Sequence, residues 1–138
     1  KLRAEPRFDG WRFMLVGGPG DHAPAAPALA ASGERAIDCV GRGDILASAA
    51  AIDRATLFVG NDSGLMHVAA AARRPTLGLF GPTEWWLYGP WGSTTRTVAS
   101  NETRGAFAPI EALSVDQVFA AVLALHADFI ASPPAAAP

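Results

Sequence analysis

Cysteine and charge are both scarce in this chain of 138 residues. Cys39 is the only cysteine, which excludes an internal disulfide, and its apolar neighbours indicate a packed side chain rather than a nucleophile. Charged residues make up 17% of the chain and its net charge is −2, so it lacks the basic surface that nucleic acid binding requires. No apolar run approaches the roughly 20 residues that span a bilayer, and no signal peptide is visible. These absences favour a cytoplasmic globular protein without a nucleic acid partner.

The sequence also lacks metal-binding patterns. Its histidines and its cysteine do not have zinc spacing, and it contains no Asp-x-Asp pair of the kind that holds a divalent cation. We therefore expect neither a metal ion nor a cofactor. His22 and His126 are expected to be exposed and without a role, and only His67 stands within a motif.

Half of the residues are hydrophobic, and short apolar runs alternate with helical patterns through glycine-rich turns. Strands that alternate with helices in this way predict a parallel sheet covered by helices on both faces. The predicted fold class is therefore α/β, a doubly wound parallel sheet of at least four strands. Strands are expected at residues 11–16, 35–40, 56–59, 75–80 and 96–99, and helices at residues 23–31, after residue 44, from about residue 63, and at residues 114–130.

Two of the predicted helices begin with capping signals. Asp44 precedes a helix whose apolar positions Ile45, Ala49 and Ile52 share one face. Ser114-Val115-Asp116-Gln117 has the spacing of a capping box.

Residues 1–131 are expected to form one domain, and the Pro/Ala-rich residues 132–138 are expected to form a disordered tail. The apolar face of the last helix is predicted to consist of Val115, Val118, Phe119, Val122, Leu125 and Phe129.

The most informative segment is residues 60–71, Gly-Asn-Asp-Ser-Gly-Leu-Met-His-Val-Ala-Ala-Ala. It follows an apolar strand and opens a helix, so it directs unpaired N–H groups and a positive dipole end at one point. Such a point binds anions, and open parallel sheets bind their ligands beyond the carboxyl ends of the strands. Asp62 adds an acceptor that suits a ligand with both phosphate and hydroxyl groups. The alternative is that Asp62 or Ser63 only caps the helix.

Other glycine-rich turns occupy equivalent positions along the chain. Residues 17–21, 41–43 and 81–83 each follow a predicted strand, as residues 60–64 do. Because the carboxyl ends of parallel strands meet at one edge of a sheet, we expect these four turns to line one concave edge. Their convergence is stronger evidence for a binding site than any single turn.

The order of these motifs resembles a known family. Residues 17–21 (Gly-Gly-Pro-Gly-Asp), 60–69, 80–83 (Phe-Gly-Pro-Thr) and 89–92 (Gly-Pro-Trp-Gly) look like the carboxyl-terminal domain of the lipopolysaccharide heptosyltransferases, a family of glycosyltransferases. The resemblance covers about residues 11–130. It implies a GT-B architecture, in which two Rossmann-like domains flank the active site and the carboxyl-terminal domain binds the nucleotide sugar, typically ADP-heptose.

The resemblance also assigns roles by position. Asp62 and Thr83 would contact the donor sugar, and the N–H groups of Ser63, Gly64 and Leu65 would bind the diphosphate. His67 lies about one turn after Ser63 on the predicted helix, which would let it reach the diphosphate as well. As an alternative, His67 is a structural side chain bonded to a backbone carbonyl. The residues implied to bind the nucleoside are Gly18, Asp21, Gly41 and Arg42.

Three departures from the family stand out. Glu84 replaces a common aspartate, and Trp85-Trp86 stand where small or polar residues are usual. These tryptophans and Trp91 would stack on a sugar or base, or else pin the loop in place. Lys1 is the first residue, and the preceding strand, helix and amino-terminal domain of the family are expected to be missing. The general base and the site for a lipid-linked saccharide acceptor are expected in that domain, so no catalytic residue is assigned here.

The resemblance thus implies an inverting, metal-independent glycosyltransferase of lipopolysaccharide biosynthesis. This fragment would supply the donor-binding half and would be inactive alone. Its location would be the cytoplasm or the inner face of a Gram-negative inner membrane. Two alternatives remain open, another GT-B nucleotide-sugar enzyme such as an epimerase, or a nucleotide-binding module without catalytic activity.

Overall fold

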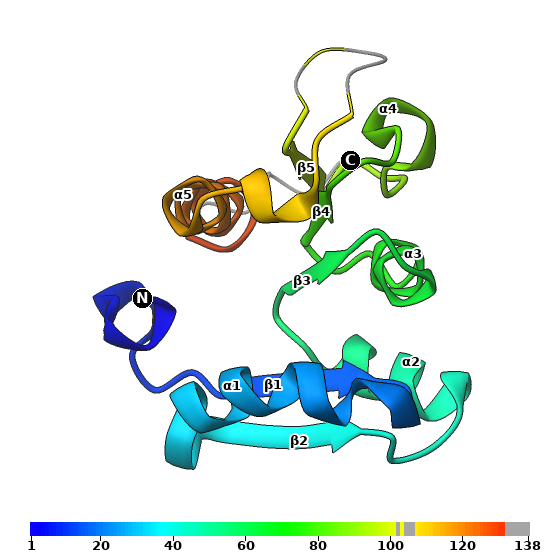
Figure 1. Cartoon of the computed structure of the whole chain (residues 1–138). Helices are drawn as coiled ribbons and strands as arrows, with labels where there is room; N and C mark the ends of the chain where they lie inside the picture. The colour runs from blue at the N-terminus through cyan, green and yellow to red at the C-terminus, as the bar shows by residue number, and fades with distance from the viewer. Residues whose placement is uncertain (102, 104–106, 132–138) are drawn as a thin grey trace, which may run out of the picture. The chain divides into compact units, whose positions relative to one another are not determined.

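A computed structural model of the chain describes residues 1–101, 103 and 107–131 (Figure 1). The tail predicted at residues 132–138 lies outside the described residues. The chain divides into two compact units, Lys1–Ala55 and Thr56–Pro138, and each is described by itself.

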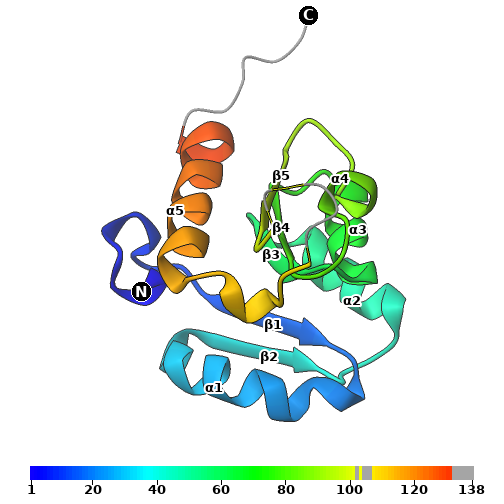
Figure 2. The same ribbon diagram turned by 45° about the horizontal axis from the view of Figure 1, so that its top comes forward.

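The first unit is built on two parallel strands, β1 (Phe13–Gly17) and β2 (Ala36–Val40). Helix α1 (His22–Ser32) connects them and packs on both, and α2 (Ile45–Asp53) follows β2 and packs on β1. Gly33, with φ +57°, ends α1 in a conformation that favours glycine. This unit is therefore one strand–helix–strand motif with a further helix. Figure 2 shows α1 running alongside the strand pair.

The second unit contains a three-stranded parallel sheet in the order β3–β4–β5. Helix α3 packs on β3 and β4, and α5 packs on β4 and β5. Figures 1 and 2 show α3 and α5 on opposite sides of β4, so both faces of this sheet are covered. The elements are β3 (Phe58–Asn61), α3 (Gly64–Ala71), β4 (Thr76–Phe80), α4 (Trp85–Tyr88), β5 (Thr95–Ala99) and α5 (Val115–His126), which a π-helical turn (Ala127–Ala131) extends.

The central strand β4 carries the core of the second unit. Leu77 and Phe80 are fully buried, as are Met66 from α3 and Leu125 from α5. Gly78 allows the helix to come close, because a methyl group on its Cα would lie 2.6 Å from Met66 Sδ. Burial of these side chains fixes α3, and with it the turn that precedes α3, against the sheet.

The predicted α/β fold with parallel strands and intervening helices is confirmed. Both predicted caps are also present: Asp44 accepts a hydrogen bond from Ala47 N at 2.9 Å, and Ser114 and Gln117 form the capping box. The prediction of one sheet with at least four strands differs from the observed pairing: the strands form two sheets, of two strands in the first unit and three strands in the second.

Four details differ from the sequence analysis. Val115 and Ile45 are 69% and 55% exposed, because each is the first residue of its helix and lies beyond the packed turns. His126 was expected to be exposed and is buried, because it lies in the last turn of α5 close to Leu125. Helix α4 lies within a segment predicted to be a loop.

Across residues 1–101, 103 and 107–131, no helix is long and apolar enough to cross a membrane.

Candidate functional site

Three consecutive strands of the second unit end at the same edge of its sheet. The β3–β4 ladder continues as Asp62 N–H donates to the Leu79 carbonyl at 3.1 Å. The β4–β5 ladder continues in the same way, since Ser100 N–H donates to the Phe80 carbonyl at 2.9 Å. Asp62 and the turn at residues 81–83 therefore follow neighbouring parallel strands, as the sequence predicted. Open α/β sheets bind ligands at this edge.

The turn before α3 leaves backbone donors available for a ligand. Ser63 is the N-cap, with an extended backbone (φ −160°, ψ 165°), and Met66 N–H donates to its carbonyl at 3.2 Å. The N–H groups of Ser63, Gly64 and Leu65 precede that bond and have no intrahelical acceptor. A methyl group on Gly64 would meet no atom within 4 Å, so the space beside this residue is open. This geometry suits an anion.

Asp62 does not cap α3. Its carboxylate has no hydrogen bond or ion pair with any residue that the structure describes, and the Ser63 side chain makes no capping bond. The side chain of Asp62 is half-buried, whereas Ser63 is exposed. The Asp62 carboxylate is therefore free to accept hydrogen bonds from a ligand at this edge of the sheet. This is what a donor-binding role for Asp62 requires.

The remaining predicted residues of this unit are His67 and Thr83. Both are exposed. His67 lies in the first turn of α3, close in sequence to the free N–H groups, and Thr83 lies in the turn that follows β4. Within the described part of the chain neither side chain has a hydrogen-bond partner, so the alternative structural role for His67 receives no support.

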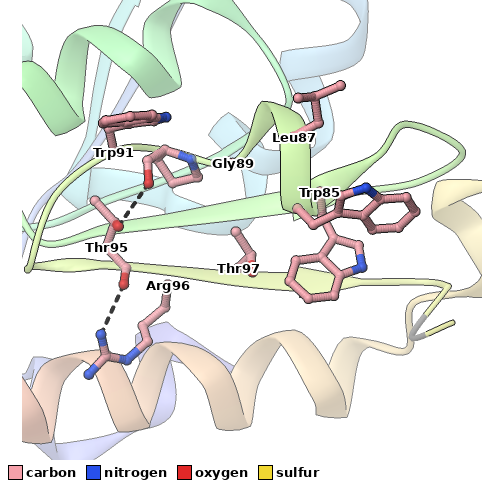
Figure 3. A pocket seen from close by; sticks show the side chains of 9 residues that line it. Trp85, Leu87, Gly89, Trp91, Thr95, Arg96 and Thr97 are labelled. Atoms are coloured by element: carbon pink, nitrogen blue, oxygen red, sulfur yellow. Dashed lines mark hydrogen bonds between the residues drawn. The ribbon is translucent and has the colours of Figure 1, made fainter. Parts of the chain in front are cut away.

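Helix α4 follows Thr83 and is anchored to the segment after β5. Trp85 Nε1–H donates to the Asn101 carbonyl at 3.2 Å, and the Trp85 and Trp86 rings meet edge to face with centroids 5.7 Å apart. Trp85 therefore pins the loop, as one of the two interpretations of the tryptophans proposed. An open groove runs along α4 and β5, and Figure 3 shows Trp91 and Trp85 at opposite ends of it. Its lining residues are Trp85, Trp86, Leu87, Gly89, Pro90, Trp91, Thr95, Arg96 and Thr97.

In the first unit, the turns after β1 and β2 lie against each other. Gly41 N–H donates to the Gly17 carbonyl at 2.9 Å, which extends the ladder of the two strands. Gly18 N–H donates to Asp21 Oδ2 at 2.7 Å, so one carboxylate oxygen of Asp21 closes its own turn. The sequence analysis did not foresee this bond, which fixes the orientation of the Asp21 carboxylate.

Gly41 and Arg42 begin the turn after β2. Gly41 has φ +65°, and a methyl group on its Cα would lie 3.2 Å from Pro19 Cα, so both conformation and space favour glycine here. Arg42 is exposed and pairs with Asp38 at 3.7 Å. Gly18, Asp21, Gly41 and Arg42 thus share one edge of the first sheet, and their exposed surfaces are available to a ligand.

Within each unit, the structure places the predicted residues at one edge of that unit's sheet. That all four glycine-rich turns line one edge remains a prediction. Among the described residues, no group of three or more His, Cys, Asp or Glu side chains could hold a metal ion.

Comparison with known proteins identifies the family. Residues 4–109 match the family model of glycosyltransferase family 9 (heptosyltransferase). Lipopolysaccharide heptosyltransferase 2 from Escherichia coli K12 is 36% identical over an alignment that covers 54% of this chain and 23% of that protein. Lipopolysaccharide heptosyltransferase 3 from the same strain is 48% identical over 30% of this chain and 12% of its own length. These two alignments thus span less than a quarter of the length of each curated relative.

Solved structures agree with this assignment. The E. coli ADP-heptose lipopolysaccharide heptosyltransferase II has a TM-score of 0.75 and 27% identity, covering 90% of this chain and 39% of that one. A family 9 glycosyl transferase from Veillonella parvula has a TM-score of 0.76 and 26% identity, covering 86% of this chain and 37% of that one. The E. coli heptosyltransferase WaaC, solved with ADP, is 22% identical with a TM-score of 0.72, and shares the fold. On the match over residues 4–109, the chain belongs to glycosyltransferase family 9, the heptosyltransferase family.

Proposed function

We propose that this chain is the donor-binding part of a glycosyltransferase that moves a heptose from a nucleotide diphosphate to a lipopolysaccharide core acceptor. The observation that carries the proposal is the turn before α3. There, a carboxylate without a structural partner, Asp62, adjoins N–H groups that have no intrahelical acceptor. A nucleotide sugar carries the two complementary features, sugar hydroxyls and a diphosphate.

The roles follow from this geometry. The Asp62 carboxylate accepts hydrogen bonds from donor-sugar hydroxyls, and Thr83, exposed in the neighbouring turn, contacts the same sugar. The N–H groups of Ser63, Gly64 and Leu65 bind the diphosphate, and His67 adds a donor at the same end of α3.

The first unit supplies the nucleoside-binding residues. Gly18 brings its backbone close to the ligand, because it has no side chain that would hold the ligand away. Gly41, whose side-chain position is taken by His22 and Pro19, borders the same nucleoside. Asp21 keeps one carboxylate oxygen, Oδ1, for the ribose hydroxyls while Oδ2 closes its turn. Arg42 flanks the base. ADP is the proposed nucleoside diphosphate, since two similar solved proteins are named for ADP or for an ADP sugar.

The proposed reaction is a direct displacement at the anomeric carbon with inversion. As the bond between sugar and diphosphate breaks, negative charge grows on the leaving phosphate. Backbone N–H groups already directed at that phosphate stabilise the charge without rearrangement, and the positive end of the α3 dipole adds to the effect. The general base and the acceptor site are proposed to lie outside these 138 residues.

The test uses the full-length protein with ADP-heptose and a lipid A–core acceptor lacking the heptose. We expect a heptosylated product whose anomeric configuration is opposite to that of the donor, detected by mass spectrometry and NMR. An epimer of the nucleotide sugar in place of a transfer product would identify an epimerase. ADP binding without any turnover, over a series of acceptors, would identify a nucleotide-binding module.

A further inference from the structure

His22, the first residue of α1, lies against the turn that follows β2. A methyl group on the Cα of Gly41 would come within 2.7 Å of His22 Nε2 and 3.4 Å of Cε1. The Nε2–Cε1 edge of the imidazole therefore packs on the Gly41 backbone. This contact lies wholly within the first unit and joins the turns after two neighbouring parallel strands, β1 and β2.

His22 is open to solvent despite this contact. His22 is exposed, and its ring has no hydrogen bond or ion pair with any residue that the structure describes. One edge of the ring is thus in contact with glycine, and the residue as a whole is exposed. The result is an exposed aromatic ring beside Gly41.

We propose that His22 is a further donor-binding residue, whose imidazole stacks on the nucleoside of the donor. The inference rests on the proposed function, which assigns Gly18, Asp21, Gly41 and Arg42 to the nucleoside. A ligand that approaches the Gly41 backbone meets the imidazole at the same time, because the two are in contact. Aromatic rings bind nucleobases by stacking, whichever base is present, so His22 strengthens binding without selecting the base.

The stacking role predicts different effects on two ligands. ADP carries a nucleoside, whereas pyrophosphate carries only the diphosphate. We expect His22→Ala in the full-length protein to raise the Kd for ADP about fivefold or more, and to leave the Kd for pyrophosphate unchanged. His22→Phe keeps an aromatic ring and should recover most of the ADP affinity. Isothermal titration calorimetry measures all of these constants.

The matched control is Arg12→Ala. Arg12 is exposed next to the amino end of β1, at the edge opposite the turns, and should leave both constants unchanged. Wild-type ADP affinity in His22→Ala would overturn the inference and leave the proposed function standing. Equal loss of ADP and pyrophosphate binding would also overturn it, since it would indicate a structural role. ADP affinity that His22→Phe does not restore would rule out stacking. Failure of the wild-type protein to bind ADP would overturn the proposed function and the inference together.

Discussion

Asp44 and Asp62 both precede helices, yet only Asp44 makes a capping hydrogen bond, to Ala47 N at 2.9 Å. On the proposed function, Asp44 has a structural role, and Asp62 has a role in donor binding. Asp62→Ala should leave the melting temperature nearly unchanged and should reduce the rate of transfer by about 10- to 100-fold. This factor corresponds to the free energy that a hydrogen bond to a charged group contributes. Melting temperature and turnover are measured on the same preparation of the full-length enzyme.

The control for that experiment is Asp44→Ala. It removes a true cap and should cost about 0.5–2 kcal/mol of stability. A lower melting temperature for Asp62→Ala, with unchanged turnover per folded molecule, would show that Asp62 has a structural role only.

Gly41 is constrained by both its conformation and its neighbours. Its φ of +65° disfavours any other residue, and an added methyl group would contact His22 Nε2 and Pro19 Cα. Gly41→Ala should therefore lower the free energy of unfolding by about 1–3 kcal/mol. The His22 ring can rotate away, but the backbone of Pro19 and the left-handed conformation cannot adapt as easily. Urea denaturation measures the change.

Gly20 offers a matched control for Gly41. A methyl group on Gly20 would meet nothing within 4 Å, and its φ is not positive. Gly20→Ala should therefore leave stability within about 0.5 kcal/mol of the wild type. Equal free energies of unfolding for Gly41→Ala and Gly20→Ala would show that the turn after β2 accommodates the added methyl group without strain.

At the scale of elements, the amino end of α3 allows one N–H group to be removed without breaking the helix. Gly64 is the first helical residue, and Ser63 before it is extended, which is the conformation that a proline requires of its predecessor. Gly64→Pro should keep the fold and lower transfer by about 10- to 100-fold, since one hydrogen bond to the charged diphosphate is lost. Gly64→Ala retains the N–H group and should stay close to wild type. Similar activity of the two variants would show that this N–H group does not bind phosphate.

Helix α4 depends on a contact that is distant in sequence. Trp85→Phe removes the hydrogen bond to the Asn101 carbonyl while keeping an aromatic ring. We expect a loss of about 0.5–1.5 kcal/mol and faster amide exchange across α4 and Thr83, measured by hydrogen–deuterium exchange. Trp91 is 85% exposed, so Trp91→Phe should change neither the free energy of unfolding nor the rate of amide exchange. Unchanged exchange in Trp85→Phe would mean that packing alone holds α4.

The elements that the sequence predicted well are those with local signals. The strand before Asp62, the Asp44 cap and the Ser114 capping box follow from residue order alone, and all are present. Helix α4 was missed because its position depends on Trp85 reaching a carbonyl 16 residues away. The bond between Gly18 N–H and Asp21 was missed because the sequence does not show which way a turn carboxylate points.

At the scale of the whole molecule, the chain covers 37–39% of two similar solved structures, so transfer is to be measured on the full-length protein. The negative charge that develops on the leaving diphosphate can be stabilised in two ways, by a divalent cation or by groups of the protein. We propose that the turn before α3 provides the second, because the N–H groups of Ser63, Gly64 and Leu65 lie together at the positive end of the helix dipole.

We therefore expect the full-length enzyme to transfer heptose at the same rate before and after dialysis against EDTA. The reason is that fixed N–H groups need no reorganisation as charge develops, so a cation would add little to the reacting step. The measurement is the initial rate with ADP-heptose in metal-free buffer, in EDTA, and with added Mg²⁺. Gly64→Pro serves as the internal comparison, since it removes one of the N–H groups that are proposed to take the place of a cation. If EDTA abolishes transfer and Mg²⁺ restores it, the leaving group depends on a metal, and the role assigned to α3 must be limited to donor binding.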